Sequence, residues 1–571
     1  MPVRWLARRI ATPFALMLLV GGCGLLLSLD DFSDAPAGSA GAGQGNCQDE
    51  TLNGDETDVD CGGSCPAGCA AGQACRISDD CRGGDCVESR CQPTCSDGER
   101  NGDETDVDCG GGVCPACATG LHCTSDRDCV SGLCDGVICS ESIVWARTLG
   151  TPVAALRAIA SNDVGSVLLH GSFGGTVDFG GQSMNSAGYV DLFVAKLNPL
   201  GEHLWSKRFG DDGIDFATSI RIAADDSIVC AGYSNGSINF GGGALPSGDG
   251  FDIYLAKLAF SGGHLWSKRF GASSLTRQEF PTDLQVDSQG NVYLSGAYQE
   301  PFSFGGANLP GGSSSSSGVF LVKLDASGGH MWSRGFLDTG VMDWSFIDID
   351  VSGNVIMAGG FQSSINFGGG VLTSAGESDV FLVKLNASGS HVWSHRFGDA
   401  AMQSVTAIAV DAQGDVVLVG RFKGTIDFGG GPLSASGNSD IFVAKLDRHG
   451  EHVWSKRFDD DNTTATGVRV AVSPAGHVFV AGSFSGLTDL GGGVISSAGG
   501  TDVFVLELTA DGGYRRSHHF GGSGDQNLTA LALSGGHLVL GGSFKESIDF
   551  GSGPIAAAGE YDVFLAKLRA P

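Results

Sequence analysis

The stretch SVTAIAVDAQGDVVLVGRFKGTIDFGGGPLSASGNSDIFVAKLDRHGEHVWSKRF, residues 404–458, decides the fold. It holds four runs rich in β-branched and aromatic residues, TAIAVD, DVVLVGRF, DIFVAKL and HVWSKRF. They are separated by AQG, by the long connection GGGPLSASGNS and by DRHGE, all of which have the residues of turns. No part of the stretch has a helical period. The unit is therefore predicted to form four β-strands.

This unit recurs along most of the chain, and one aromatic position marks each copy. Successive landmarks are 60 to 66 residues apart, and a period of this kind indicates a propeller or a solenoid. Four strands joined by short links favour the blade of a propeller, whose strands run outward from a central axis. The landmarks are Trp145, Trp205, Trp266, Trp332, Trp393, Trp454 and Tyr514.

The two ends of the array predict how the ring closes. The last unit stops after DVFLAKL, residues 562–568, without the strand that carries the landmark aromatic residue. An unmatched strand, IVWARTL at Ile143–Leu149, begins the array. Pairing the two would complete a seventh blade and remove sheet edges that invite aggregation. We predict an all-β fold in which residues 141–571 form a closed seven-bladed β-propeller.

The repeated motifs DIFVAKL at 440–446 and IAVDAQGDVVLVG at 408–420 resemble those of the bacterial β-propeller repeat family. The resemblance covers all seven units and implies the propeller fold. It implies little about function, because propellers carry many unrelated activities.

The N-terminus indicates export and tethering. Arg4, Arg8 and Arg9 precede an apolar run that ends in VGGC at Cys23, which looks like a bacterial lipoprotein signal. Residues 1–22 would be removed, Cys23 would carry the lipid, and residues 23–46, rich in Gly, Ala and Ser, would form a flexible tether. Residues 10–29 could also remain as a membrane anchor, although three glycines and a cysteine favour cleavage.

Seventeen of the 18 cysteines lie before residue 140, and sixteen of them form two repeats with a period of 48 residues. Eight cysteines in each copy predict four disulfides per copy, and hence an extracytoplasmic location. The pairing is left open. The repeats, 47–94 and 95–140, contain Cys47, Cys61, Cys65, Cys69, Cys75, Cys81, Cys86 and Cys91, and then Cys95, Cys109, Cys114, Cys117, Cys123, Cys129, Cys134 and Cys139.

Zinc binding is the competing interpretation of these cysteines. Cys65 with Cys69, and Cys114 with Cys117, resemble pairs of zinc ligands, but their spacing differs between the copies, which disfavours a tetrahedral site. The whole pattern resembles a cysteine-rich repeat of surface proteins in Gram-negative soil bacteria, where it accompanies lipoprotein signals and propeller repeats. That resemblance implies no particular chemistry.

The acidic stretch NGDETDVDCGG occurs at residues 53–63 and again at 101–111. Clustered carboxylates suit calcium, but their spacing is not that of an EF-hand. The Asn-Gly pair is typical of a tight turn. We favour an acidic turn of a disulfide scaffold and keep calcium as the only candidate cofactor. Its candidate ligands are Asp55, Asp58, Asp60, Asp103, Asp106 and Asp108.

Three patterns that resemble catalytic or binding sites are better explained by the fold. Ser234 in GYSNG matches a nucleophile elbow, but the units at Gly171, Gly420 and Gly482 have phenylalanine there and no helix follows. Histidines two residues before the tryptophans lie about one blade apart, too far to share a metal ion. The aspartates that open the FVAKL-type strands suit bonds to their own turns, and the tryptophans suit packing between blades rather than sugar stacking.

Residues that break the repeat are better candidates for ligand contacts. Arg277, Tyr298, Gln299, Glu300 and Trp344 belong to this class, although Trp344 aligns near the core residue Val405. Cys230 lies in an apolar strand and is expected to be a buried, unreactive thiol.

A net charge of -30 and an isoelectric point near 4.6 exclude nucleic acid as a partner. No HExxH motif, distinctive pair of catalytic acids or sialidase-type Asp box is present. We therefore expect a non-enzymatic binding or scaffold lipoprotein, tethered at the outer membrane or cell surface, with a protein or glycan partner. The alternatives are an extracytoplasmic propeller lyase or hydrolase and a calcium-dependent adhesin.

Overall fold

The computed structural model describes part of the 571-residue chain, and the chain divides into two compact units, Met1–Asp97 and Gly98–Pro571. Among the described residues, no helix is long and apolar enough to cross a membrane. The predicted signal, Cys23, the tether, Cys47, Asp55, Asp103 and Arg277 lie outside the described residues. Those described are 48, 50–52, 56–65, 68–70, 72–82, 85–92, 95, 100, 104–111, 114–118, 121–129, 134, 139, 143–149, 154–246, 250–271, 279–311, 317–338, 340, 342–436, 439–458, 466–551 and 553–570.

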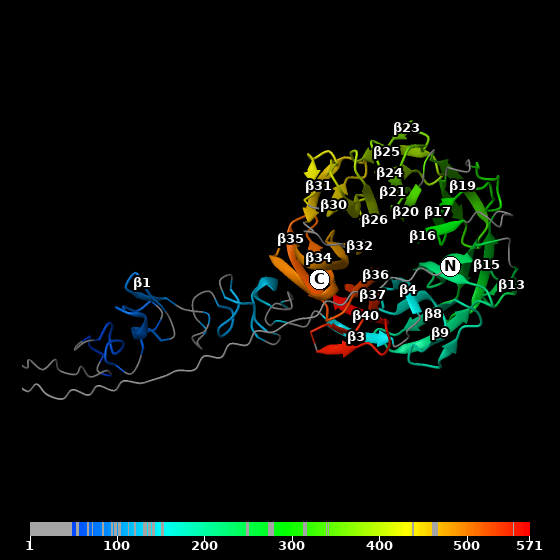
Figure 1. Ribbon diagram of the computed structural model, residues 1–571. Coiled ribbons are helices and arrows are strands. Elements are labelled where there is room, and N and C mark those ends of the chain that lie inside the picture. Colours follow the sequence, from blue (N-terminus) through cyan, green and yellow to red (C-terminus); the bar gives the residue numbers. More distant parts are fainter. Residues whose placement is uncertain are drawn as a thin grey trace, which may run out of the picture. The chain divides into compact units, whose positions relative to one another are not determined.

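Seven four-stranded antiparallel sheets form the blades of a propeller (Figure 1). This confirms the predicted fold class. The innermost strands are β4 (Ala154–Ser161), β10 (Asp215–Ile222), β16 (Phe280–Val286), β20 (Met342–Ile349), β26 (Gln403–Val410), β32 (Thr466–Val472) and β36 (Gln526–Ser534). The second strands are β5 (Val167–Phe173), β11 (Ile228–Ser234), β17 (Val292–Tyr298), β21 (Val355–Phe361), β27 (Val416–Phe422), β33 (Val478–Asp489) and β37 (His537–Phe544).

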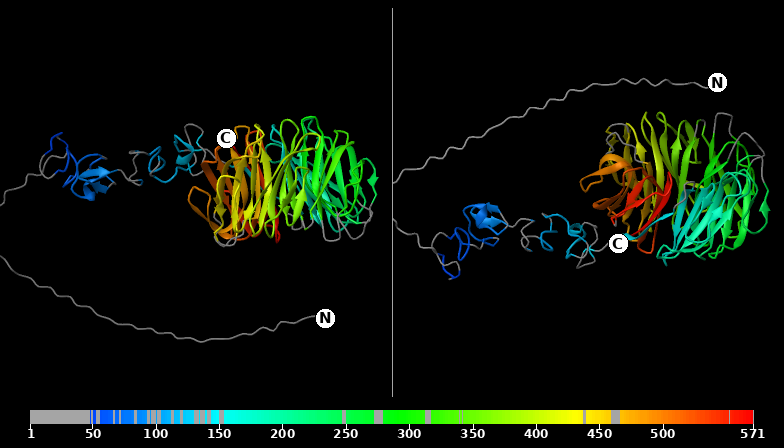
Figure 2. Two further views of the ribbon diagram at one scale, coloured as in Figure 1. Left: turned by 90° about the horizontal axis from the view of Figure 1, so that it is seen from above. Right: turned by 60° about the horizontal axis from the view of Figure 1, so that its bottom comes forward.

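The outer half of each blade is equally regular, and Figure 2 shows the ring from two further sides. The third strands are β8 (Asp191–Leu197), β14 (Asp252–Leu258), β18 (Gly318–Leu324), β24 (Asp379–Leu385), β30 (Asp440–Leu446), β34 (Val494–Leu508) and β40 (Asp562–Arg569). The outermost strands are β9 (His203–Phe209), β15 (His264–Phe270), β19 (His330–Leu337), β25 (His391–Phe397), β31 (His452–Phe458), β35 (Tyr514–Phe520) and β3 (Ile143–Leu149).

The ring closes as predicted. Strand β3 pairs antiparallel with β40, from Ile143 opposite Leu568 to Leu149 opposite Val563, and completes the seventh blade. The seven innermost strands contact one another in order around the axis, and the last contact joins β36 to β4. The ring therefore has no open sheet at the junction of its ends.

The long connection between the second and third strands is more ordered than the sequence suggests. In five blades it forms a small hairpin, and in the sixth blade β33 and β34 run on as one long hairpin. The small hairpins are β6 (Thr176–Val177) with β7 (Met184–Asn185), β12 (Ile238–Asn239) with β13 (Ala244–Leu245), β22 (Ser364–Asn366) with β23 (Val371–Thr373), β28 (Thr425–Ile426) with β29 (Leu433–Ser434), and β38 (Ser547–Asp549) with β39 (Pro554–Ala556).

The hydrophobic core lies between neighbouring blades. Every residue of β30 is buried, which explains why DIFVAKL reads as a continuous apolar run rather than an alternating one. One core cluster joins Leu382 of the fourth blade to Leu418 and Phe442 of the fifth. Each blade is therefore stabilised by its neighbours on both sides.

The landmark tryptophans connect neighbouring blades. The indole Nε1 of each donates to a backbone carbonyl in the turn between the third and outermost strands of the following blade, at 2.9–3.2 Å. For example, Trp145 on β3 bonds Pro199 O at 2.9 Å and so joins the seventh blade to the first. This agrees with the predicted packing role and adds a hydrogen bond that the sequence alone did not indicate.

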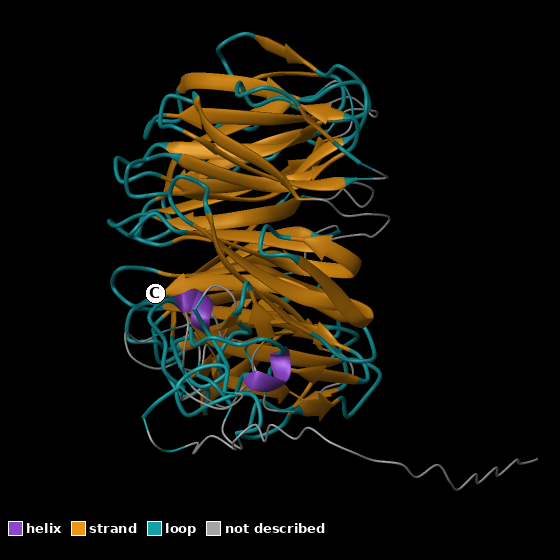
Figure 3. Ribbon diagram, turned by 90° about the vertical axis from the view of Figure 1, so that its left-hand side faces the viewer, coloured by secondary structure: helices purple, strands orange, loops and turns teal. Residues whose placement is uncertain are grey.

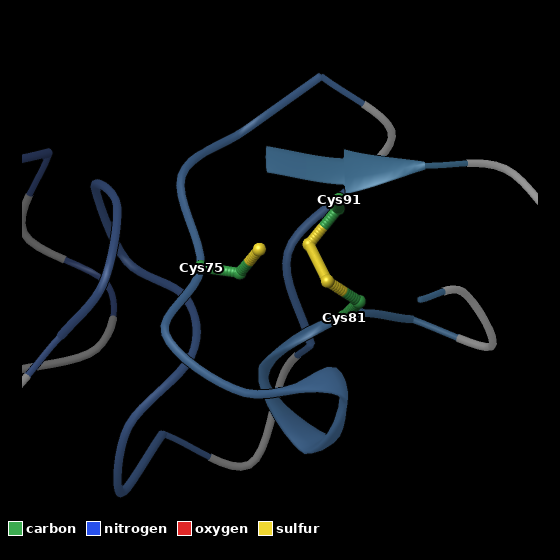
Figure 4. Close-up of side chains that lie close together, drawn as sticks. All are labelled: Cys75, Cys81 and Cys91. Carbon is green, nitrogen blue, oxygen red and sulfur yellow. A yellow bond between two sulfur atoms is a disulfide. The ribbon is translucent and has the colours of Figure 1, made fainter. Parts of the chain in front are cut away.

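The two cysteine-rich repeats share one disulfide pattern. The first has the bonds Cys61–Cys69, Cys75–Cys86 and Cys81–Cys91, and the second has Cys109–Cys117, Cys123–Cys134 and Cys129–Cys139. Cys65, Cys95 and Cys114 are disulfide-bonded as well. The sulfurs pack on one another, as Figure 4 shows for Cys75 beside the Cys81–Cys91 bond. The paired cysteines are thus not zinc ligands.

A buried aspartate organises each cysteine-rich repeat, and the sequence analysis missed it. Asp80, at the end of the 3-10 turn η1 (Ser78–Asp80), accepts hydrogen bonds from the amides of Gly63, Arg76 and Ile77 at 2.7–3.1 Å. Asp128, at the end of the 3-10 turn η2 (Asp126–Asp128), repeats the arrangement. Apart from these two turns, the secondary structure of the described residues consists of strands (Figure 3). In the first repeat, β1 (Asp85–Val87) pairs with β2 (Arg90–Gln92).

Candidate functional site

The repeated histidines serve the structure of their own blades. His203 Nε2 lies 3.1 Å from Ser206 Oγ on the same strand, and the other four histidines repeat this contact at 3.0–3.2 Å. The ring packs beneath the glycine-rich loop of its blade, so that a Cβ on Gly181 would lie 2.3 Å from His203 Cε1. The structure therefore gives each of these histidines a local packing role.

The repeated aspartates of the third strands bond their own turns, as predicted. Asp440 Oδ2 accepts from Ser436 N at 2.9 Å and also from Arg457 Nη1 at 2.9 Å. Asp191 makes the same pair of contacts with Ala187 N and Arg208. The partner arginine of the WSKRF strand was not anticipated. These pairs fix the outermost strand to the third strand and do not face the axis as a common site.

Ser234 and Cys230 are structural residues. Ser234 is fully buried at the position that phenylalanine occupies in other blades, and its Oγ donates to Gly236 O at 3.1 Å. Cys230 is a free, fully buried thiol, and burial raises its pKa to about 12. Neither side chain has the exposure that a nucleophile needs.

Two buried carboxyl groups, Asp191 and Asp215, face a shared space beside Gly210. A Cβ on that glycine would lie 2.5 Å from Asp215 Oδ2 and 2.8 Å from Asp191 Oδ1. Both atoms, and Asp215 Oδ1, are buried without a hydrogen-bond partner among the described residues. Burial raises the pKa of Asp215 to about 7, and the negative charge of Asp191 contributes in the same direction.

Replacing Asp215 by Asn is expected to stabilise the protein in alkaline solution. Because its pKa is higher in the folded state, at about 7, than in the unfolded state, the stability of the native chain falls as pH rises from about 4 to about 7. An amide remains uncharged, so D215N should gain on the order of 2 kcal/mol over the native chain at pH 8 and little at pH 4. Chemical denaturation at both pH values measures this. D212N, at an exposed neighbour, is the control, and a loss of stability in D215N at pH 8 would refute the assignment.

In the acidic stretches of the cysteine-rich repeats, several carboxylate oxygens accept hydrogen bonds from backbone amides. Asp58 accepts from Val59 N at 2.8 Å and Ala74 N at 2.7 Å, and Asp106 accepts from Val107 N and His122 N, both at 2.7 Å. Asp60 accepts from Glu50 N at 2.9 Å. These bonds lower the pKa of Asp58 and Asp106. Calcium binding at these aspartates and at Asp108 stays a prediction.

Polar residues that do not repeat accumulate on the innermost strands. Asp283 of β16 accepts from Arg221 Nη2 on β10 at 3.1 Å and from Ile347 N on β20 at 3.1 Å. Arg221 Nε also donates to Gln285 at 3.0 Å, and Asp348 of β20 accepts from Val410 N on β26 at 2.7 Å. One chain of hydrogen bonds thus links the inner strands of four consecutive blades.

Burial shifts the titration of these groups. It raises the pKa of Asp348 to about 6 and raises that of Asp283 against the opposing pull of Arg221. Their oxygens are nevertheless occupied by Arg221 and by backbone amides. The two carboxyl groups therefore hold neighbouring blades together around the axis.

Two arginines of the innermost strands keep unused donors. Arg469 of β32 donates to Val468 O at 3.1 Å, and its remaining N–H groups bond no atom of the described residues. It sits at the same register as Asp283, three blades away, and burial lowers its pKa. Arg157 of β4 is exposed and makes no hydrogen bond or ion pair within the described part of the chain. These guanidinium groups can receive an anionic group of a ligand.

Aromatic side chains gather where the inner strands of the second and third blades begin. Phe216 lies 5.1 Å from Tyr233 and 6.1 Å from Phe251, and Tyr233 lies 4.8 Å edge-on from Phe280, between ring centroids. All four are partly exposed. Trp344 occupies the position on β20 that Phe216 and Phe280 occupy on β10 and β16, because its carbonyl approaches Gly359 as theirs approach Gly232 and Gly296. We call these five residues the aromatic rim.

Trp344, one of the contact candidates, is not a core residue, although alignment by sequence placed it near Val405. Its carbonyl approaches Gly359 as that of Ser404 approaches Gly420, so the residue corresponds to Ser404 and not to Val405. Its side chain is 61% exposed, whereas Val405 is 5% exposed. Tyr298, chosen as a contact candidate, is fully buried beside Phe302 and Phe320. Its neighbours Gln299 and Glu300 are partly exposed after β17.

Sequence reasoning missed Arg157, Arg221, Asp283, Asp348 and Arg469. A signal for four of them was present, because β4, β26 and β36 carry alanines at the two inner positions where other blades carry Arg221, Asp283, Asp348 and Arg469. Arg157 lies instead at the bulge position of β4, where four other blades carry threonine. Placing the seven inner strands in register would have exposed the differences.

Parts of the chain are similar to known proteins. No protein-family model matches the chain. It is 22% identical over 350 residues to an uncharacterized WD repeat-containing protein of Acanthamoeba polyphaga mimivirus, with 49% of this chain and 25% of the relative covered. It is 25% identical over 325 residues to a regulatory protein, FlaEY, of Caulobacter vibrioides, with 52% and 33% covered. The chain thus spans a quarter to a third of the length of these relatives.

Among solved structures, the β-propeller domain of the Trilobed protease from Pyrococcus furiosus aligns with 72% of this chain and 97% of its own length, at 8% identity and a TM-score of 0.38. The protein is an all-β, seven-bladed β-propeller preceded by a disulfide-rich N-terminal region.

Proposed function

We propose that the protein is a binding module of the cell envelope, in which the propeller presents a ligand site and the N-terminal region serves as a disulfide-bonded stalk. The observation that carries this proposal is the contrast between repeated and unrepeated side chains. The repeated histidines, aspartates and tryptophans serve the blades. By contrast, the exposed or partly exposed residues of the aromatic rim and the cations Arg157 and Arg469 lie on or beside the inner strands. Such a site suits recognition of a ligand at one end of the ring axis.

The proposed location rests on the disulfides and on the lipoprotein signal. Six disulfides with defined partners in two short repeats are typical of proteins that fold outside a reducing cytosol. The lipoprotein signal ending at Cys23 would tether the mature chain to a membrane, most simply the outer membrane, and the resemblance to bacterial propeller repeats fits this placement. We propose no catalytic role for the binding module.

The test is affinity capture from envelope extracts with the soluble chain, residues 24–571, and with its W344A variant. Wild-type capture that W344A reduces about tenfold would support a ligand site at the aromatic rim. Y189A is the matched control, because Tyr189 is 80% exposed but lies in the loop before β8 and not on an inner strand. Capture that W344A and Y189A leave equally intact would count against a site at the rim.

A propeller lyase or hydrolase is the second candidate, and the raised pKa of Asp348 and Asp283 favours it. Product formation from a panel of polysaccharides and esters by the native chain, abolished in D348N, would establish an enzyme. Activity that D348N retains would exclude Asp348 as its catalytic acid.

A further inference from the structure

We propose that the aromatic rim and the inner-strand positions next to it bind a single strand of an acidic polysaccharide, with sugar rings on the aromatic side chains and carboxylates on Arg157 and Arg469. This inference rests on the proposed binding function and names its ligand class. The site is formed by the inner strands of consecutive blades, which contact one another around the axis.

The aromatic side chains present fixed, partly exposed faces. Tyr233 is held between Phe251 at 5.6 Å and Phe280 at 4.8 Å, both in edge-on geometry, so its ring is oriented before any ligand arrives. Trp344, on the next blade, is 61% exposed. The C–H faces of a sugar ring are apolar and flat, and they pack on such rings while the sugar hydroxyls point outward. Preorientation lowers the entropic cost of binding.

Hydroxyl groups lie at the bulge positions of four innermost strands. The bulge positions of β10, β16, β26 and β36 all carry threonine, and the bulge position of β4 carries Arg157. All four threonines are partly exposed. Thr406 Oγ1 donates to Val419 O at 3.4 Å, and Thr529 Oγ1 donates to Gly541 O at 3.2 Å, so their lone pairs can accept from sugar hydroxyls. The threonines are Thr218, Thr282, Thr406 and Thr529.

The charges at this end of the strands select an anionic sugar. Arg221 and Asp283 neutralise each other at 3.1 Å, but Arg157 has no counter-ion in the described part of the chain, and four N–H donors of Arg469 are unused there. In a chain with a net charge of -30, an anion is repelled elsewhere on the surface. Guanidinium groups pair with carboxylates through two parallel hydrogen bonds, so uronic acids are the favoured class.

The size of the site favours a glycan strand over a folded protein. A stable protein interface needs about 800 Å² from each partner. The rim consists of five aromatic side chains on three blades, four of them partly buried, and it borders repeated structural residues. Five side chains are far fewer than the roughly 20–30 residues that each partner contributes to a stable protein interface, and they suffice for contact with a few sugar rings.

Calorimetry with uronic acid tetramers tests the inference on the soluble chain, residues 24–571. The probes are tetragalacturonate, tetramannuronate and tetraguluronate, each beside its neutral methyl ester. At least one tetramer should bind, and its ester should bind about tenfold more weakly. W344A should weaken both forms about tenfold, R157Q should remove the preference for the acid form, and Y189A should change neither. No binding of any tetramer, or equal binding of acid and ester, would overturn the inference.

The same variants separate this inference from the binding function. If W344A abolishes capture from envelope extracts and the captured material is destroyed by protease, the ligand is a protein and only the glycan inference fails. If capture does not depend on Trp344 and no tetramer binds, both fail. Thermal melting of W344A and R157Q should match the native chain, because both side chains are exposed.

Discussion

Replacing Ile143–Leu149 by the flexible sequence GSGSGSG is expected to prevent the full chain from forming a stable propeller. The change removes the strand that pairs with β40 and takes the partly buried Trp145 and the buried Leu149 out of the core between the last and first blades. Loss of one buried leucine costs about 2–5 kcal/mol, so the whole strand should cost more than about 4 kcal/mol. It also exposes the apolar edge of β40, which favours aggregation. Thermal melting and size-exclusion chromatography measure both effects.

The matched control replaces Ile143–Leu149 by HVWSKRF, the sequence of β31. That strand occupies the same outermost position in the fifth blade and carries its tryptophan at the same place, so it should restore a monomeric, cooperatively melting protein. If the GSGSGSG variant melts like the native chain, β3 does not close the ring.

D80A is expected to disrupt the first cysteine-rich repeat. Removing the carboxylate takes away the acceptor of three part-buried hydrogen bonds from the amides of Gly63, Arg76 and Ile77, at roughly 0.5–1.5 kcal/mol for each bond. The repeat has a core of cystines and little else, so it has no reserve of apolar burial against this loss. Disulfide mapping by mass spectrometry should find mispaired cysteines in place of Cys75–Cys86 and Cys81–Cys91.

Asp79 provides the control for this prediction, since it is the exposed neighbour on the same 3-10 turn. D79A should give the native disulfide map, and the same map from D80A would refute the role of Asp80. The backbone hydrogen bonds lower the pKa of Asp80 in the folded state. Its contribution is therefore complete above the unfolded pKa of about 4 and is lost as pH falls through the folded value.

The fold was predictable because one pattern of four strands and their turns occurs seven times in the sequence. Any single unit, such as residues 404–458, shows four strands and their turns, and the unmatched IVWARTL shows how the ends meet. The small hairpins were missed because their strands are two or three residues long and lie among glycines, where no period can be read. The disulfide pairing was open because spacing alone does not determine it.

The candidate site was harder to predict, because its side chains come from different blades. Tyr233 and Phe280 are far apart in sequence, and only the ring brings them to 4.8 Å. The alignment of Trp344 with Val405 instead of Ser404 has a local cause. Every inner strand contains a β-bulge, and in β20 the shift spans Met342 to Ser345, so alignment by sequence placed the residue one position away from its structural equivalent.

The closing strand β3 is also the first strand of the propeller along the chain. It directly follows the cysteine-rich repeats in the chain, so tension applied to the N-terminal region enters the propeller through Ile143, at the end of the strand that pairs with Leu568 of β40. Each of the other six blades is made of consecutive chain segments, so a force applied at the N-terminal side does not reach them first. A pulling force on the N-terminal region would therefore act on the seventh blade before any other blade.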